Sequence, residues 1–183
     1  MKRWIAFAFA IVCVLSLAGC GGKETQEAGT GETNLSSAEP VQPQKSPPAL
    51  TVTCGGQSTV ALSGTYSWQY DNGDGTMTGV EACGGGALFE LEWMTPLSRN
   101  GSESVTLDFA VEPESISVRC WNDEYANDAN SYAANYTELT CENGTVEIPT
   151  DGSYIYEVYA QWGAGNAYYS FYIVDFSYCG LTE

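Results

Sequence analysis

The sequence predicts an all-β fold, an antiparallel β-sandwich that spans residues 49–183. Apolar and polar residues alternate with period two in several short stretches, which is typical of strands buried on one face. Gly, Asn and Asp turn signals separate these stretches, and helix signals are scarce. About ten short strands in a region of this length favour two packed sheets.

The alternation is clearest in three stretches. SVTLDFAV (104–111) places an apolar residue at every second position, and SISVRCW (115–121) and SYIYEVYAQW (153–162) do the same. Further strands are predicted at 50–54, 59–70, 76–82, 87–94, 136–142, 145–149 and 166–178. Three tryptophans within these patterns are expected to be in or half in the core: Trp68, Trp93 and Trp162.

The C-terminal part of this region, residues 151–176, resembles the last two strands of an immunoglobulin-like domain. Gly152 lies two residues before Tyr154, the spacing of a tyrosine corner, in which a tyrosine hydroxyl bonds back to the preceding backbone. The sequence GAGN at 163–166 then forms a hairpin turn to the final strand. The resemblance implies an immunoglobulin-like arrangement of the sandwich.

The N-terminus has the order of a signal peptide. Two basic residues precede an apolar run at residues 4–16, which is shorter than the roughly 20 residues that a spanning helix needs. The sequence LAGC at 17–20 follows and resembles the lipobox of bacterial lipoproteins. This resemblance implies that residues 1–19 are removed and that the thiol of Cys20 carries diacylglycerol. The alternative is an ordinary secretory signal in which Cys20 is incidental.

Residues 20–48 then form a predicted linker behind Cys20. Gly, Glu, Ser, Thr, Gln and Pro dominate it, and it contains no aromatic residue. Such a segment buries too little apolar surface to offset its chain entropy, so it is expected to be disordered. As a flexible coil it would hold the domain roughly 30 Å from its anchor.

The charge of the chain excludes several functions. The net charge is −17, and residues 49–183 contain 19 acidic residues but only two basic ones. An acidic domain repels phosphate, so no nucleic acid and no electrostatic membrane docking are expected. The chain has no histidine, which removes Ser-His-Asp and Cys-His catalysis and the commonest metal ligand. We therefore expect no enzyme, no cofactor and no metal site.

One stretch nearly matches a calcium loop. YDNGDGTMTGVE (70–81) has the spacing of an EF-hand, but its first position is Tyr70 instead of an acidic residue. The Asn-Gly and Asp-Gly dipeptides are strong turn signals, and the flanks alternate as strands do. The stretch is predicted to be a hairpin tip, with weak cation affinity from Asp71 and Asp74 left open.

Export favours disulfides, and the predicted domain has an odd number of cysteines. Cys120 and Cys141 flank the long connection 122–140, so a bond between them would close its base and stabilise the fold by about 3 kcal/mol. The other three leave any second pairing open, and the alternative is that all five stay reduced. The five are Cys54, Cys83, Cys120, Cys141 and Cys179.

The same connection contains the candidate ligand-binding residues. Trp121 lies opposite the apolar face of its strand, next to the loop, and is the best candidate for an exposed binding aromatic. Tyrosines beside carboxylates suit sugar stacking and hydroxyl bonding, or a bound cation. The alternative is a solvated loop whose tyrosines lie back on the sandwich. The candidates are Trp121, Asp123, Tyr125, Asp128 and Tyr132, with Glu124 and Tyr136 beside them.

Much of residues 50–178 also resembles a group of uncharacterised surface lipoproteins of Gram-positive anaerobes. The matching motifs are GTYSW (64–68), PESISVRCW (113–121), YIYEVYAQW (154–162) and AYYSFYI (167–173). The resemblance implies a sandwich and a surface location, without a catalytic residue. We expect a lipid-anchored, non-catalytic domain on the extracytoplasmic side of the cell membrane. Its partner would be an envelope glycan or a surface protein, and the alternative is a carbohydrate-binding module.

Overall fold

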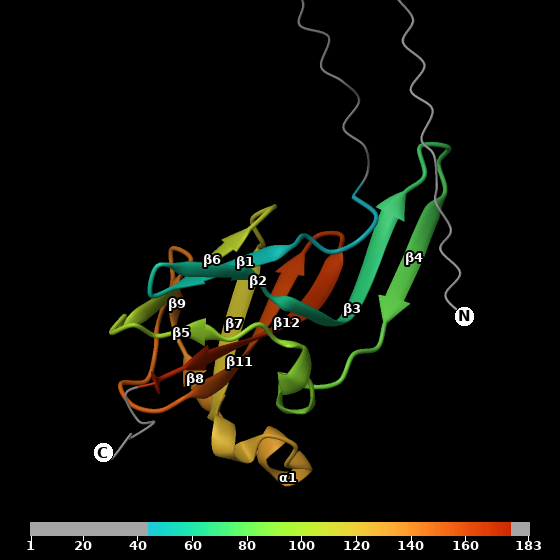
Figure 1. Ribbon diagram of the computed structural model, residues 1–183. Coiled ribbons are helices and arrows are strands. Elements are labelled where there is room, and N and C mark those ends of the chain that lie inside the picture. The colour runs from blue at the N-terminus through green and yellow to red at the C-terminus, as the bar shows by residue number, and fades with distance from the viewer. Residues whose placement is uncertain (1–43, 177–183) are drawn as a thin grey trace, which may run out of the picture. The chain divides into compact units, whose positions relative to one another are not determined.

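The computed structural model describes residues 44–176, which form two antiparallel β-sheets packed face to face (Figure 1), so the predicted all-β sandwich is confirmed. Short helical turns occupy two of the connections. The strands are β1 (Leu50–Cys54), β2 (Gln57–Val60), β3 (Leu62–Asp71), β4 (Met77–Ala82), β5 (Leu97–Ser98), β6 (Ser104–Phe109), β7 (Ser115–Asn122), β8 (Thr137–Leu139), β9 (Cys141–Glu142), β10 (Thr145–Glu147), β11 (Tyr154–Trp162) and β12 (Gly165–Val174). The helices are the 3₁₀ turns η1 (Ala87–Phe89), η2 (Leu91–Trp93) and η3 (Asp123–Tyr125) and the one-turn α1 (Ala129–Tyr132).

The two sheets differ in size. The smaller has the order β2-β1-β6-β10-β9. The larger has the order β4-β3-β12-β11-β7-β8, and β5 adds a short parallel pairing to β12. In the larger sheet β11 pairs along its whole length with β12 and almost as far with β7, so it is the central strand. A residue on β11 therefore has cross-strand neighbours on both sides.

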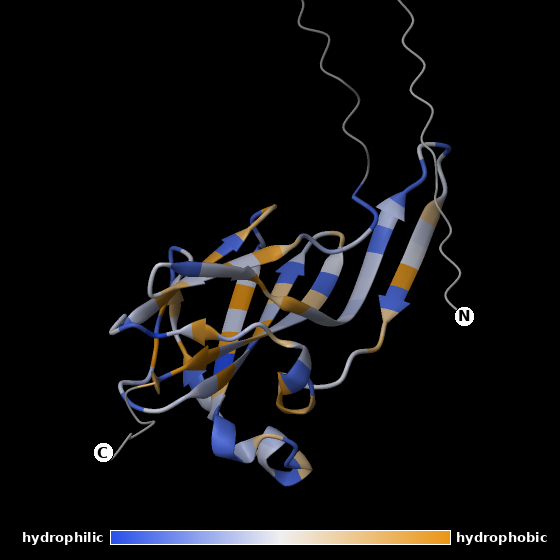
Figure 2. Ribbon diagram, viewed as in Figure 1, coloured by the Kyte–Doolittle hydropathy of each residue, from blue (hydrophilic) through white to orange (hydrophobic). Residues whose placement is uncertain are grey.

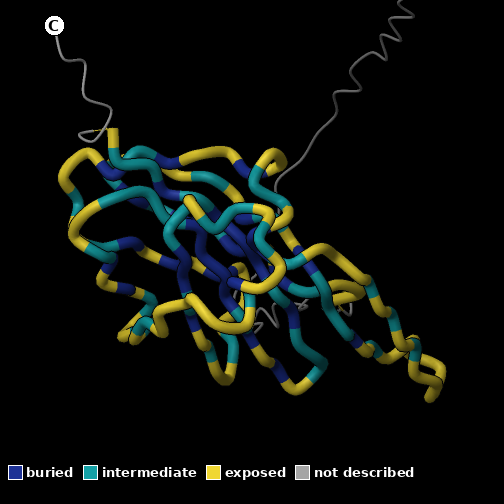
Figure 3. The backbone as a smooth tube through the Cα atoms, turned by 90° about the horizontal axis from the view of Figure 1, so that it is seen from below, coloured by how far each residue is buried: buried dark blue, intermediate teal, exposed yellow. Residues whose placement is uncertain are grey.

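The main core lies between the sheets and consists of the inward-facing half of each alternating pattern. Tyr156, Val158 and Ala160 of β11 are buried in it, with Trp68 and Trp162 packed edge to face 5.6 Å apart. Figure 2 shows the apolar and polar residues alternating along the strands, and Figure 3 shows the buried residues gathered between the layers. The prediction that Trp68 and Trp162 belong to the core is confirmed.

Two predicted strands are each divided between the two sheets. The stretch 59–70 contains parts of β2 and β3, with buried Ala61 between them. The stretch 136–142 contains β8 of the larger sheet and β9 of the smaller one, with Thr140 between them. Alternation is a local property and does not show where a chain changes sheets.

The predicted strand at 87–94 is wrong, because this segment forms η1 and η2. Ala87, Leu88 and Met94 are buried by these turns against the outer face of the larger sheet. Trp93 consequently points away from the sheet and is 71% exposed, so its predicted core position is also wrong.

The hairpin predicted at 70–81 is confirmed. Asp71 of β3 is paired with Met77 of β4, and the carboxylates of Asp71 and Asp74 accept hydrogen bonds from the backbone N–H of Gly73 and Thr76. These bonds are the local turn contacts that Asp makes in tight turns. Strands flank the turn where an EF-hand has helices.

The predicted disulfide between Cys120 and Cys141 is not formed, and both thiols are free. Cys120 is paired with Thr137 of β8 in the larger sheet, whereas Cys141 lies on β9 of the smaller sheet. Cys54 and Cys83 are also free, and burial raises the pKa of Cys120 to about 12.

The packed domain begins earlier than predicted. The indole N–H of Trp68 donates to the carbonyl of Gln44, and the hydroxyl of Tyr169 donates to the carbonyl of buried Pro48. The last residues of the predicted linker are therefore part of the fold. The signal peptide, Cys20, the rest of the linker and Cys179 lie outside the described residues. Within 44–176, no helix is long and apolar enough to cross a membrane.

Tyr154 is the first residue of β11, and Gly152 lies in the turn two residues before it. Gly152 has a φ of 89°, which glycine adopts without strain. The hydroxyl of Tyr154 interacts with the side chain of Asn122 on the neighbouring strand β7. The immunoglobulin-like assignment, which depends on a bond to the preceding backbone, stays a prediction.

Candidate functional site

The outer face of the larger sheet carries a second apolar cluster. Segment 83–94 and segment 122–136 fold over this face and bury Leu88, Trp121 and Ile155 against each other. The two segments therefore act as covers over part of the sheet. The part that they leave open is the candidate site.

Trp121 lies under the second cover. Its side chain is 0% exposed, its indole N–H donates to the carbonyl of Ser131 in α1, and its ring stacks on Tyr132 with centroids 5.4 Å apart and an interplanar angle of 8°. Trp121 lies on the outer face of the sheet, as the alternation predicts. The prediction that it offers an exposed surface to a ligand is wrong, because the loop folds back over it.

The other predicted site residues hold this cover in place. The carboxylate of Asp128 caps α1 and accepts from the Ser131 hydroxyl at 2.5 Å, and these bonds lower its pKa. Asp123 accepts from the hydroxyl of Tyr172 at 2.7 Å. Tyr125 is half-buried against the cluster. The arrangement matches the alternative in which the loop tyrosines lie back on the sandwich.

A partly buried ion pair, in which the Arg119 side chain is 28% exposed, lies at the edge of the covered area. Glu157 of β11 is 3% exposed, and its Oε1 accepts from Nε and Nη2 of Arg119 at 2.8 and 2.6 Å. Its Oε2 accepts from the Tyr132 hydroxyl at 2.7 Å and from the N–H of Ala87 at 3.4 Å. The carboxylate of Glu157 thus connects β11 with both covers through hydrogen bonds. Burial and the bond to Glu157 raise the pKa of Tyr132 to about 12.

Aromatic rings surround the guanidinium of Arg119. It lies 4.6 Å from the ring centroid of Tyr132, 4.8 Å from that of Trp121 and 5.3 Å from that of Tyr136. Tyr132 comes this close to the sheet because Gly86 has no side chain, since a Cβ there would lie 2.6 Å from the tyrosine ring. The positive charge of Arg119 is therefore neutralised by one carboxylate and covered by aromatic faces.

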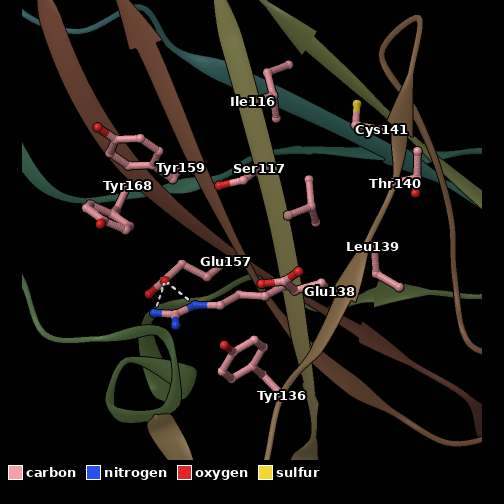
Figure 4. A pocket seen from close by; sticks show the side chains of 12 residues that line it. Ile116, Ser117, Tyr136, Glu138, Leu139, Thr140, Cys141, Glu157, Tyr159 and Tyr168 are labelled. Atoms are coloured by element: carbon pink, nitrogen blue, oxygen red, sulfur yellow. Dashed lines mark hydrogen bonds and ion pairs between the residues drawn. The ribbon is translucent and has the colours of Figure 1, made fainter. Parts of the chain in front are cut away.

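Beside the ion pair is an open groove with a volume of about 490 Å³, within the range of small-ligand sites. Tyr159 of β11 and Tyr168 of β12 are cross-strand partners with ring centroids 4.8 Å apart. Figure 4 shows these two rings on one side of Glu157 and Tyr136 on the other. Ser117, Glu138 and Thr140 add hydroxyl and carboxylate groups to the lining, and the ion pair of Arg119 and Glu157 also contributes to it. The remaining lining residues are Ile116, Val118, Leu139 and Cys141.

The groove offers stacking surfaces and hydrogen-bonding groups in a half-buried setting. Tyr159 and Tyr168 are half-buried and Tyr136 is 37% exposed, so each ring keeps an accessible surface. No three Cys, Asp or Glu side chains among residues 44–176 converge to hold a metal ion. The arrangement suits binding by stacking and hydrogen bonding.

A carboxylate of unusual environment lies within the first cover, between η1 and η2. Glu90 accepts from the N–H of Gly85 at 2.7 Å through Oε1, while its buried Oε2 has no hydrogen-bond partner. Burial, opposed by the bond from Gly85 and assisted by the nearby charge of Glu157, raises the pKa of Glu90. Glu90 is not part of the groove lining.

A second hollow, of about 840 Å³, lies across the segment 137–140 from the groove. It shares Glu138, Leu139 and Thr140 with the groove. Its only aromatic residue is Tyr154, and it contains two further carboxylates, Glu142 and Glu147. The second hollow is therefore larger than the groove but has fewer aromatic rings on which a ligand could stack. We take the smaller groove as the candidate site because three aromatic side chains line it.

Sequence reasoning missed most of the groove. The alternation in SYIYEVYAQW (153–162) puts Glu157 and Tyr159 on the same face of the strand, but no function is predicted for either residue. The usable signal is that a charged and an aromatic side chain lie next to each other on one face of this strand. Tyr136 was considered only as part of the loop.

Comparison with protein-family models, with curated proteins and with solved structures finds no match for this chain. The resemblance to bacterial surface lipoproteins therefore stays a prediction from the sequence.

Proposed function

We propose that this chain is a lipid-anchored, non-catalytic domain on the extracytoplasmic side of the cell membrane, and that the tyrosine-lined groove of its larger sheet binds a ligand there. The anchor is supported by the order of basic residues, apolar run and LAGC ending at Cys20. The binding role is supported by one observation above all. Tyr136, Tyr159 and Tyr168 converge on a groove that the rest of the described chain leaves open.

A carbohydrate of the cell envelope is the ligand class that this groove favours. Sugar rings stack on aromatic faces through their C–H surfaces, and their hydroxyls bond to carboxylates and side-chain hydroxyls. The groove offers both kinds of group, the second through Ser117, Glu138 and Thr140. A non-catalytic role is supported by the absence of histidine from the sequence and by the engagement of Glu157 in the ion pair with Arg119.

The binding role predicts that Tyr159→Ala and Tyr168→Ala each weaken glycan binding. Each variant removes one ring of the paired stacking surface, so we expect the dissociation constant for cell-envelope glycan fragments to rise by at least about tenfold. Calorimetry with the full chain measures this. Tyr70→Ala is the matched control, because Tyr70 is a half-buried tyrosine of β3, a strand that contributes nothing to the groove lining. Equal weakening by all three variants would contradict the site.

The anchor predicts that Cys20→Ser releases the protein from the membrane. Without the thiol no diacylglycerol is attached, and one or two acyl chains supply most of the membrane affinity of a lipoprotein. Fractionation of expressing cells should find the variant outside the membrane pellet. Cys83→Ser, which changes an exposed free thiol, is the control. A Cys20→Ser protein that stays fully in the membrane fraction would show that the lipobox assignment is wrong.

A further inference from the structure

The charges that line the groove are Arg119, Glu138 and Glu157. Arg119 and Glu157 neutralise each other, and the guanidinium uses Nε and Nη2 for the bonds to Glu157. Its faces lie against the rings of Tyr132, Trp121 and Tyr136. Arg119 therefore has little capacity to attract an anionic ligand.

Glu138 differs from the other two. It is paired in register with Arg119 across β7 and β8, yet it is exposed, and no ion pair forms between it and any residue of 44–176. Its carboxylate lies in the wall that Tyr136 and Leu139 also form (Figure 4). The groove consequently has one uncompensated negative charge beside three aromatic rings.

An uncompensated carboxylate with aromatic faces around it favours a cation. The negative faces of tyrosine rings attract ammonium groups, and a carboxylate pairs with them directly. The acidity of the domain adds to this preference, since residues 49–183 contain 19 acidic and two basic residues. Anionic sugars are disfavoured for the same reason.

We infer that the groove prefers glycans with a free amino group over their N-acetylated counterparts, with the ammonium held by Glu138 and the sugar rings stacked on Tyr159 and Tyr168. The inference rests on the proposed function, because it assumes that the groove binds a glycan. N-acetylation removes the positive charge and adds bulk, so the groove distinguishes the two forms by charge. The hydroxyls of Ser117 and Thr140 serve the uncharged part of the sugar.

The test compares two probes, the β-1,4-linked trimers of glucosamine and of N-acetylglucosamine, titrated into the full chain at 0.15 M salt. Exposed charges more than about 8 Å apart are largely screened at this salt concentration. We expect the glucosamine trimer to bind at least about tenfold more tightly, and Glu138→Gln to reduce this preference to about twofold or less. Thermal unfolding of the variant should match that of the wild type, because Glu138 is exposed.

Glu81→Gln is the matched control for long-range charge. It removes the same charge from the exposed strand β4, at the opposite edge of the larger sheet, and should leave the preference unchanged. A Glu81→Gln effect as large as that of Glu138→Gln would overturn the inference, since general acidity would then explain the preference. If both trimers bind equally well and Tyr159→Ala abolishes this binding, the inferred preference for free amino groups is overturned, while the proposed glycan-binding function stays in place. Binding of neither trimer would also overturn it, and the envelope-fragment titrations would then decide the proposed function separately.

Discussion

Replacing Glu157 with alanine is expected to lower the free energy of unfolding by about 3 kcal/mol, the lower end for the loss of one partner of a buried ion pair, because the Arg119 side chain is 28% exposed. The change leaves the guanidinium of Arg119 among aromatic rings without its counter-charge. It also removes the acceptor of the Tyr132 hydroxyl and of the Ala87 N–H. Both covers of the outer face are therefore loosened together. Urea denaturation followed by tryptophan fluorescence measures the change.

Two further variants separate the charge from the packing. Glu157→Gln keeps the size of the side chain and an oxygen for Tyr132, so it should cost less than Glu157→Ala. The double variant Arg119→Met, Glu157→Leu removes both charges and should recover most of the loss, because apolar replacements of buried ion pairs are often neutral or stabilising. A Glu157→Ala protein within about 1 kcal/mol of the wild type would mean that the ion pair does not organise this face.

Replacing Trp121 with alanine is expected to cost a similar amount, about 3–5 kcal/mol. The indole is fully buried, stacks on Tyr132 and donates to the backbone of Ser131, so its removal leaves a cavity and an unpaired carbonyl. The stacked partner of Arg119 is lost as well. Denaturant unfolding at constant pH measures the loss.

Trp93→Ala is the control for this variant, since it makes the same change at a side chain that is 71% exposed. Surface substitutions usually change stability by no more than about 0.5 kcal/mol. A larger loss of stability from Trp93→Ala than from Trp121→Ala would contradict the positions of the two tryptophans. The pair also tests the main correction to the sequence-based picture, in which Trp93 is a core residue and Trp121 an exposed one.

Alternation predicts the strands of this fold well where a strand stays in one sheet. The prediction for 50–54 coincides with β1, and that for 153–162 starts one residue before β11. It fails at Ala61 and Thr140, where the chain crosses from one sheet to the other. It also fails at 87–94, because short helical turns and a short strand both place apolar residues a few positions apart.

The candidate site is harder to predict because it depends on which parts of the outer face the loops cover. Residue type alone made Trp121, Asp123 and Asp128 attractive ligand-binding residues, yet their contacts with Ser131 and Tyr172 stabilise the cover. The groove lies beside the second cover, whose last residue, Tyr136, is part of the groove lining. Its lining comes from five strands, β7, β8, β9, β11 and β12, so no local sequence pattern contains it.

Hydrogen–deuterium exchange of the full chain, with and without saturating envelope glycan fragments, tests the central claim most directly. The amides of β7, β11 and β12 are already protected in the sheet, so a ligand in the groove should act mainly on its exposed wall. We expect slower exchange in peptides that cover 134–140, which contain Tyr136 and Glu138. Protection confined to the hairpin at 70–81 or to the segment around Trp93, with 134–140 unchanged, would contradict the assignment of the groove as the ligand site.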